Sequence, residues 1–543
     1  METARTKRHL KAVPPHPPTA TVARSTFIVM IATLGSTLLG FAREVVNARY
    51  YGTRWEMDTF LAAATIPTIV FGLFNGALVS ALVPVFSEYI ATKREDEAWK
   101  LASTVLNGLL ILLSVAAVLG WLLAPFYVPL IAHGFPAPQM SVAIRMTRWL
   151  MPSIVATSLA GVLAAVLNAH HRFGGSALQG IAINVVTIGV VVWLDARLGI
   201  YALVLGTTLG LCAQLIVQLP SFARLGRYRP TIDLHHPGLS RMWSSLGPIV
   251  VGSAAGQIAL FFDRFFASTL VPGYIAAINY ANKLVGFPQQ IFAAAIATVI
   301  FPLLASHFAR DNRRALRQGV TMGLRIVVFV TVPATCGLIA LAGPIVQTLF
   351  ERGSFTPEAT AHCTALLPYA AAGLVPMAAN VILTRVCFAC AEMRWPVVIS
   401  CLAVALNIVL SVIWLPSLAA IGLLLANAVS QGVQTILLAV VAWRLLGGLN
   451  VKALARSIGA TTVCSVAMVL ALEWIASLGA PPARTFAGRA WALAGELGIG
   501  AAVFLAAARL VRAEELELTV GALWRKFTSR LPSVPENTGA PIA

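Results

Sequence analysis

The sequence predicts an all-α polytopic membrane protein with fourteen transmembrane helices: two parallel six-helix repeats followed by two further helices. Hydrophobic residues make up 58% of the 543 residues, whereas charged residues make up only 11%. A soluble protein of this length has too little interior to bury so much apolar surface, so we expect lipid to surround it. Two further observations support the class, namely the long apolar stretches and their repetition.

Each apolar stretch reaches the roughly 20 residues that a spanning helix needs. The stretches lie at residues 26–51, 58–90, 101–132, 143–168, 176–195, 200–222, 243–271, 277–305, 318–342, 359–391, 395–415, 418–446, 455–477 and 487–511. Several of them contain a proline, which removes a backbone hydrogen bond and bends a helix. We expect such bends at Pro67, Pro152, Pro248, Pro288, Pro333 and Pro368.

The two halves of the chain repeat the same landmarks. Gly52 matches Gly273 and Pro67 matches Pro288 at one common offset. Each repeat holds an even number of helices, so both repeats take the same orientation, as in two-lobed carriers. Repeated bundles with matched prolines indicate an alternating-access transporter.

The repeat divides the chain into five parts. The polar link at 225–241 is the longest polar stretch between spans and is the predicted hinge. No signal-peptide cleavage site follows the first apolar run, so we expect that run to be a retained helix. The parts are a disordered cytoplasmic tail at 1–21, an N-lobe at 22–230, a C-lobe at 231–446, the last two helices at 447–512, and a cytoplasmic tail at 513–543.

The net charge of +18 is interpreted as membrane topology. Most of the 39 Lys and Arg fall on the two tails and on the even-numbered connections, for example Arg94, Arg227 and Arg313. The positive-inside rule therefore places both termini in the cytoplasm. Basic residues spread in this way do not indicate nucleic acid, so we expect no nucleic-acid partner.

The sequence predicts no enzyme. The histidines cluster in cytoplasmic loops, for example at His170 and His171, without carboxylates at ligand spacing, and no P-loop or Ser/His/Asp arrangement stands out. Cys387 and Cys390 form a CxxC inside an apolar span, without a second pair, so packing is the predicted role. We expect no cofactor and no bound metal, apart from the sodium alternative below. Energy would then come from a sodium or proton gradient or from the membrane potential.

The charged residues inside the spans carry the predicted chemistry. Each cation would cost about 2.5–3.5 kcal/mol if it faced lipid, so each must face water or a partner. The cations are Arg43, Arg264, Lys283, Arg325 and Arg385.

Two interpretations of these cations remain open. In the first, Arg43, Glu44 and Asp58, and likewise Asp263 and Arg264, form structural ion pairs. In the second, cations of the two lobes converge on a water-filled cavity and bind an anionic head group. The second interpretation assigns pyrophosphate binding to Arg43 and Lys283, because guanidinium groups bind phosphate strongly. Arg325 and Arg385 are expected to extend toward the membrane surface instead.

A set of segments resembles one known family. The segments include LLGFAREVVNARYYG (38–52), SALVPVFSEY (80–89), GQIALFFDRFFAS (256–268), YANKLVGFPQQIF (280–292) and FERGSFT (350–356). Together they resemble the MurJ/MviN lipid II flippases of the MOP exporter superfamily, over roughly 24–445. The resemblance implies fourteen helices, a V-shaped central cavity between two lobes, and a location in the bacterial inner membrane. It also implies flipping of an undecaprenyl-pyrophosphate-linked glycan to the outer leaflet for peptidoglycan assembly.

The family's functional positions carry over in part. Arg43 and Asp58 match a family arginine and aspartate, whereas Lys283 stands where the family has an arginine and keeps only its charge. The cavity is therefore expected to be less cationic than in the family. Other family charges are replaced by Thr37, Phe71, Gly72, Asn75 and Gly286.

The resemblance also implies a gating or ion-coupling group. Its members are Asp58, Asp263, Arg264 and Asn407. Some family members hold sodium between helices, and Asp263, Asn407 and Asn427 are the matching candidates here. Ser411 stands where a carboxylate would be expected.

The predicted function is a lipid II flippase that works by alternating access, acts as a monomer, and has cell-wall glycan synthesis enzymes as candidate partners. One alternative keeps the machinery and changes the cargo to another polyprenyl-linked saccharide, for capsule or exopolysaccharide. A second is a non-transporting membrane scaffold. A multidrug or cation antiporter should show buried carboxylates in excess of cations, which this sequence does not.

Overall fold

Helices make up all the regular structure that the computed structural model describes, which covers residues 19–225, 228–310, 312–478 and 485–517. The predicted tails at 1–21 and 513–543 lie largely outside these residues. By its contacts the chain forms two units. Unit 1 comprises Met1–Asn47 and Trp55–Ser268, and unit 2 comprises Ala48–Arg54 and Thr269–Ala543.

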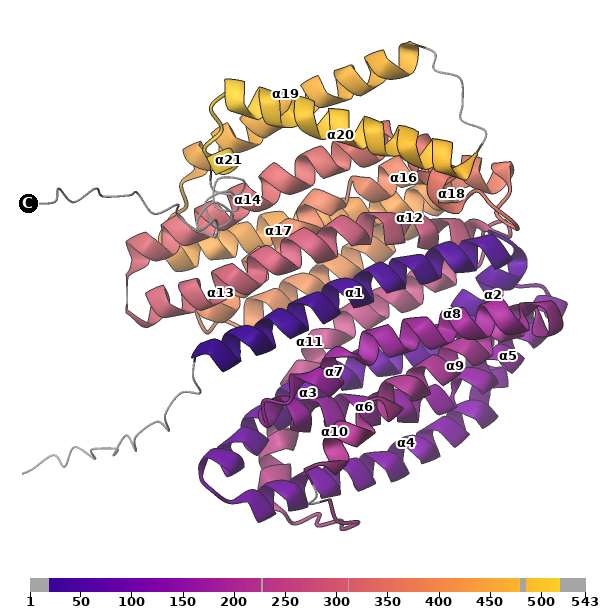
Figure 1. Ribbon diagram of the computed structural model, residues 1–543, viewed down its shortest axis with the longest axis vertical. Coiled ribbons are helices and arrows are strands. Elements are labelled where there is room, and N and C mark those ends of the chain that lie inside the picture. The colour runs from indigo at the N-terminus through magenta and orange to yellow at the C-terminus, as the bar shows by residue number, and fades with distance from the viewer. Residues whose placement is uncertain (1–18, 226–227, 311, 479–484, 518–543) are drawn as a thin grey trace, which may run out of the picture. The chain divides into compact units, whose positions relative to one another are not determined.

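Unit 1 contains most of α1 and all helices to α11 (Figure 1). These are α1 (Thr19–Tyr51), α2 (Trp55–Ala63), α3 (Thr65–Ala91), α4 (Glu95–Ile131), α5 (Ala137–Leu150), α6 (Pro152–Ala169), α7 (Phe173–Ala177), α8 (Gln179–Leu198), α9 (Ile200–Ile216), α10 (Leu219–Ala223) and α11 (Pro237–Ala267). The predicted lobe boundary at 230 differs from this grouping, since α11 packs with α3 and α4. The division of the chain into two lobes that move relative to each other stays a prediction.

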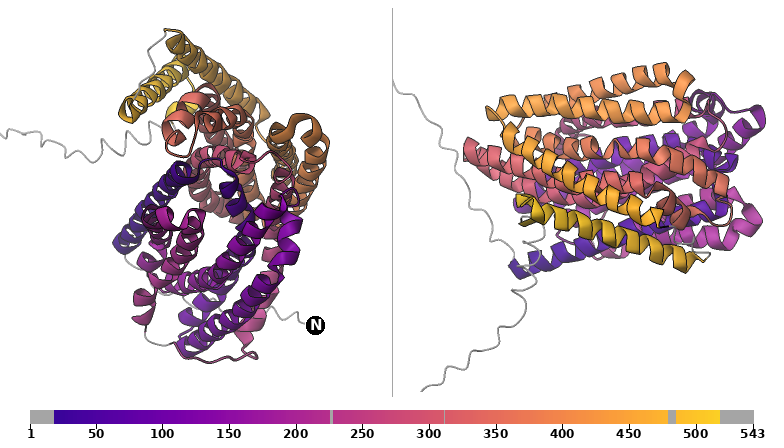
Figure 2. Two further views of the ribbon diagram at one scale, coloured as in Figure 1. Left: turned by 90° about the vertical axis from the view of Figure 1, so that its right-hand side faces the viewer. Right: turned by 90° about the horizontal axis from the view of Figure 1, so that it is seen from above.

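Unit 2 contains the remaining helices, with α19 and α20 side by side in both figures (Figures 1 and 2). They are α12 (Tyr274–Pro288), a π-helical turn η1 (Gln289–Ala293), α13 (Ala294–Ala309), α14 (Arg313–Ala340), α15 (Ala342–Phe350), α16 (Pro357–Ala371), α17 (Leu374–Ala389), α18 (Arg394–Leu446), α19 (Val451–Ser477), α20 (Phe486–Leu510) and α21 (Glu514–Leu516).

Ten helices in the described residues are long and apolar enough to cross a membrane. One of them, Arg394–Leu446, spans 53 residues and is interrupted at Ala419, where φ is 47°. The sequence predicts two spans here, 395–415 and 418–446, and the interruption falls at that boundary. The all-helical membrane fold is thus confirmed, and the helices are consistent with fourteen passes.

Two of the predicted prolines coincide with a change in the helix, whereas Pro333 and Pro368 lie inside the continuous helices α14 and α16, where a bend stays a prediction. Pro152 begins α6 directly after α5, because proline is tolerated in a first helical turn. Pro288 ends α12 and is followed by η1, as expected where a missing N–H shifts the hydrogen bonding to wider turns. Some helix starts have a side-chain cap, for example that of Asn312 before α14 and that of Asn450 before α19.

Each unit has its own apolar core. The core of unit 1 includes Leu82 and Phe86 of α3 and Leu101 of α4, all fully buried. The core of unit 2 includes Val320 of α14 and Ile382 of α17. Outward-facing positions stay apolar, as lipid contact requires. On α4, for example, the exposed side chains include Ile111, Leu112, Val115, Val118, Leu119 and Leu122.

The described part of the predicted hinge that follows residue 227, residues 228–241, is hydrogen-bonded to α4. The Asn107 side chain donates to the backbone oxygen of Thr231 (3.0 Å), and the backbone N–H of Asp233 donates to Thr104 Oγ1 (3.0 Å). These bonds hold the linker within unit 1. The chain passes from unit 1 to unit 2 only later, between Ser268 and Thr269.

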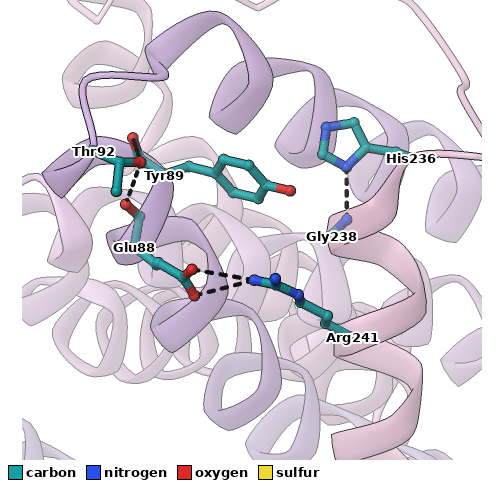
Figure 3. A network of polar contacts seen from close by, with 6 residues as sticks. All are labelled: Glu88, Tyr89, Thr92, His236, Gly238 and Arg241. Atoms are coloured by element: carbon teal, nitrogen blue, oxygen red, sulfur yellow. Dashed lines mark hydrogen bonds and ion pairs between the residues drawn. The ribbon is translucent and has the colours of Figure 1, made fainter. Parts of the chain in front are cut away.

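The end of this linker joins α11 to α3 (Figure 3). His236 accepts a hydrogen bond from the Gly238 backbone N–H at Nδ1 (3.1 Å) and so caps α11, while its ring packs edge-on against Tyr89. Arg241 forms an exposed ion pair with Glu88 (3.1 Å). The Tyr89–His236 and Glu88–Arg241 contacts therefore place the start of α11 against the end of α3.

Residues 48–54 dock into unit 2 through close backbone contacts. The Ser354 backbone N–H donates to the Arg49 oxygen (2.8 Å), and the buried Tyr280 hydroxyl donates to the Gly52 oxygen (3.2 Å). Gly52 has a φ of 55°, and a Cβ there would overlap the Ser354 carbonyl. A Cβ on Gly353 would overlap the Arg49 carbonyl in the same way. Only glycine permits this approach at both positions.

We predict that Gly52→Ala lowers the thermal unfolding temperature of the purified protein, since both the positive φ and the Ser354 contact oppose a methyl group. The backbone term alone is about 1 kcal/mol. The matched control is Gly459→Ala on α19, where a Cβ meets nothing within 4 Å. An equal effect of the two substitutions would contradict the docking described above.

Candidate functional site

Arg43 and Glu44 form an ion pair on α1. Arg43 Nη2 lies 3.0 Å from Glu44 Oε1, and the two side chains are 24% and 8% exposed. Adjacent residues on a helix point about 100° apart, yet the long arginine side chain spans that difference. The first interpretation of the sequence, a structural ion pair, is therefore present for these two residues. Arg43 keeps enough exposure to reach a second anion.

A second charged group joins α2 and α11. Asp58 lies in the first turn of α2, where the helix dipole favours a carboxylate, and is only 2% exposed. Arg264, in the last turn of α11, is close enough to interact electrostatically with both Asp58 and Asp263. The structure thus brings together three of the predicted gating residues within unit 1. The group therefore consists of two carboxylates around one guanidinium.

Lys283 lies in unit 2 on α12, the helix that Pro288 ends. Its side chain is exposed, whereas its neighbours Tyr280 and Leu284 are buried in the unit. Lys283 therefore lies on the face of α12 that does not pack into the core of unit 2. Its predicted role in binding pyrophosphate stays a prediction.

The sodium candidates belong to different units. Asn407, in α18 of unit 2, is 5% exposed, and its Oδ1 accepts a hydrogen bond from Ser411 (3.1 Å). The Asn427 backbone oxygen accepts one from Ser430 (2.9 Å). Asp263 belongs to unit 1. The structure describes no cluster of three His, Cys, Asp or Glu side chains, so the sodium site stays a prediction.

The two other cations in predicted spans have partners within unit 2. The Arg385 guanidinium lies 5.7 Å from the ring centroid of Phe301 in a cation–π contact. Arg325 forms two ion pairs, at 2.8 Å with Glu514 and 2.6 Å with Glu515. Arg325 was expected to extend toward the membrane surface, which stays a prediction, and its two partners belong to the segment that follows the last predicted span.

Glu515 is the charged partner that the sequence analysis missed. Burial alone would raise the pKa of this carboxyl, but the Ser457 and Arg325 side chains outweigh burial and hold the pKa below its usual range. The carboxylate is therefore ionised at neutral pH although it is 2% exposed. The available signal was the acidic segment at 514–517, which follows an apolar span directly.

The chain matches a family model described as lipid II flippase MurJ over residues 47–482. A probable lipid II flippase MurJ from Rhizobium meliloti (strain 1021) is 30% identical over 500 residues, which cover 88% of this chain and 91% of the relative. A lipid II flippase MurJ from Burkholderia cenocepacia is 28% identical over 419 residues, covering 75% of this chain and 81% of the relative.

Solved structures support the same fold. A structure described as lipid II flippase MurJ in an inward closed conformation matches with a TM-score of 0.75 and 22% identity, over 89% of this chain and 98% of that one. An inward-facing multidrug resistance MATE family transporter of the MOP superfamily matches with a TM-score of 0.65 and 14% identity, over 76% and 94%.

We predict that the charges of Asp58 and Arg264 are energetically coupled. Arg264→Gln removes a positive charge that interacts with both carboxylates, so adding Asp58→Asn should recover part of the lost stability. A double-mutant cycle on thermal unfolding should give a coupling of about 1–3 kcal/mol. Glu88→Gln is the control second substitution, because its partner Arg241 lies about 35 Å from Arg264 along α11. Additive effects in the Asp58–Arg264 cycle would contradict the interaction.

Proposed function

Since the chain belongs to the lipid II flippase MurJ family, we propose that it moves lipid II across the bacterial cytoplasmic membrane for peptidoglycan synthesis. The observation that carries this function is the match to the family model over residues 47–482. The alignment of the Rhizobium meliloti relative with 88% of this chain supports it. The function belongs to a transporter, and no catalytic role is proposed.

The cargo joins a long apolar tail to a pyrophosphate, and the protein has to hold the charged part away from lipid. We assign this contact to Arg43, because a guanidinium group forms two charge-assisted hydrogen bonds with phosphate oxygens. Arg43 is half-buried and pairs with Glu44. A pyrophosphate would therefore exchange with the Glu44 carboxylate, so that binding replaces one anionic partner by another.

Lys283 is proposed as the second pyrophosphate contact, from α12. An ammonium group is a compact charge without the planar fork of arginine. It would attract the phosphates without fixing their orientation.

The transport mechanism is proposed to be alternating access by rocking of two lobes, as repeated carriers work. The chain crosses between units 1 and 2 at three points: between residues 47 and 48, between 54 and 55, and between 268 and 269. These crossings are the proposed hinges. They take the place of the linker at 225–241, which the sequence analysis predicted to be the hinge.

Coupling of transport to an ion is proposed for the group formed by Asp58, Asp263 and Arg264. Its two carboxylates offer acidic oxygens to a sodium ion or a proton, and Asn407 is proposed as a separate gating residue within unit 2. One charge that crosses a potential of 100 mV yields about 2.3 kcal/mol. Such a step is enough to bias a two-state equilibrium about 50-fold.

The proposed orientation places both termini in the cytoplasm, because the basic residues concentrate on the tails and on the even-numbered connections. Enzymes of cell-wall glycan synthesis are proposed as partners, and the chain is proposed to act as a monomer. An alternative cargo is another polyprenyl-linked saccharide, which shares the apolar tail and the pyrophosphate. The missing family charges at Thr37, Phe71 and Gly72 favour this alternative.

We predict that the chain supports growth of a bacterium depleted of its own lipid II flippase, and that Arg43→Ala abolishes this activity without lowering expression. The matched control is Arg385→Ala, which also removes an arginine from a span but only breaks a contact with Phe301. Growth rate, membrane protein level and accumulation of lipid II in the inner leaflet are the measurements.

The outcomes separate the proposed functions. A scaffold would give no rescue in any form, and a flippase for another saccharide would rescue only a strain that lacks that pathway's flippase. Normal lipid II transport by the Arg43→Ala protein would leave Arg43 with a structural role only.

A further inference from the structure

A cavity of 510 Å³ lies in unit 2, where α18 ends and α14 and α19 begin. Its volume falls within the range of small-molecule sites, about 300–1,000 Å³. We call it the α14–α19 pocket. The polar residues that line it are Arg314, Arg317, Gln318, Thr321, Arg325 and Asn450.

Arg317 is fixed in place at the pocket wall. Its Nε donates to the Leu446 backbone oxygen (2.6 Å), the last residue of α18. The Gly447–Gly448 turn, with φ of 66° and 126°, then passes over the guanidinium, and a Cβ on Gly447 would lie 3.0 Å from Nη2. The described residues offer Nη1 and Nη2 no hydrogen bond. A pre-positioned fork of N–H donors suits a phosphate group.

The charges around the pocket do not cancel. Arg325 is neutralised by Glu514 and Glu515. Within the described part of the chain, Arg314 and Arg317 have no carboxylate at ion-pair distance. They lie three residues apart on α14, so their side chains share one face. One compensated cation, Arg325, and two uncompensated ones, Arg314 and Arg317, therefore line the pocket and make it a site for an anion.

The position of the pocket identifies the kind of anion. Met322, Leu449 and Ala453 complete the wall, so the polar residues adjoin an apolar surface. The pocket lies at helix ends, next to the basic connection that is proposed to be cytoplasmic. Basic pockets between membrane helices on this side suit the phosphate of a lipid head group. The geometry points to a site for the phosphate of an anionic phospholipid between α14 and α19.

This site is separate from the proposed transport contacts, and none of its residues belongs to them. A phospholipid bound there would tie α19, and through it α20, to α14. Glu514 limits the affinity, because it is an exposed carboxylate that occupies Arg325 Nη2 beside the pocket. Binding of lipid and pairing of Glu514 therefore compete for positive charge.

The test measures binding of phosphatidylglycerol to the full-length purified protein in detergent, by native mass spectrometry, with phosphatidylcholine as the neutral lipid. Arg314→Gln should weaken phosphatidylglycerol binding about fivefold, as expected for one cation at a membrane surface. Glu514→Gln should strengthen binding, because it frees one side of Arg325. Arg456→Gln is the control, an exposed arginine of α19 that does not line the pocket.

Both test residues are exposed, so neither substitution should impair folding, and thermal unfolding checks this. Displacement of phosphatidylglycerol by inorganic phosphate would show that the site recognises the phosphate group. Binding of inorganic phosphate without phosphatidylglycerol would assign the pocket to soluble phosphate compounds and overturn the lipid. Equal phosphatidylglycerol binding by the Arg314→Gln and Arg456→Gln proteins, or no gain with Glu514→Gln, would overturn the site.

Discussion

A charge in an apolar membrane interior has to be compensated, and this constraint organises the cations of the chain. Arg43 pairs with Glu44, Arg325 with Glu514 and Glu515, and Arg264 interacts with Asp58 and Asp263. A substrate anion that reaches such a cation replaces an existing partner rather than filling an empty site. The net free energy of the exchange is small compared with that of either ion pair, so the anion also leaves easily. A carrier needs this property, because a cargo bound too tightly on one side is not released on the other.

The glycine contacts of residues 48–54 connect this charge arrangement to motion. α1 carries Arg43 in unit 1, and just over one turn later the chain belongs to unit 2, where Gly52 and Gly353 allow close backbone contact. Movement between the units would therefore act on the end of the helix that presents Arg43. In the proposed mechanism, the same short segment anchors the first helix and transmits rocking to the pyrophosphate contact.

The features that depend on local sequence were predictable. The apolar stretches, the proline bends at Pro152 and Pro288 and the interruption near Ala419 all follow from properties of neighbouring residues. Long-range pairing was not predictable in this way. Glu515 binds Arg325, far away in the sequence, and its acidic segment alone does not name a partner. The linker at 225–241 is polar whether it is free or docked, so its composition could not reveal the bonds to α4. The charges of Arg43, Asp58 and Arg264 were identified from the sequence, whereas their partners required the fold.

The most direct test of the proposed function is transport by the purified chain alone. Reconstituted into vesicles with fluorescent lipid II on one leaflet, the protein should move lipid II to the other leaflet, faster when a membrane potential or ion gradient is imposed. A different polyprenyl-pyrophosphate-linked saccharide in the same vesicles should move more slowly. Vesicles in which lipid II moves no faster than in protein-free vesicles, while the other saccharide crosses, would contradict the account.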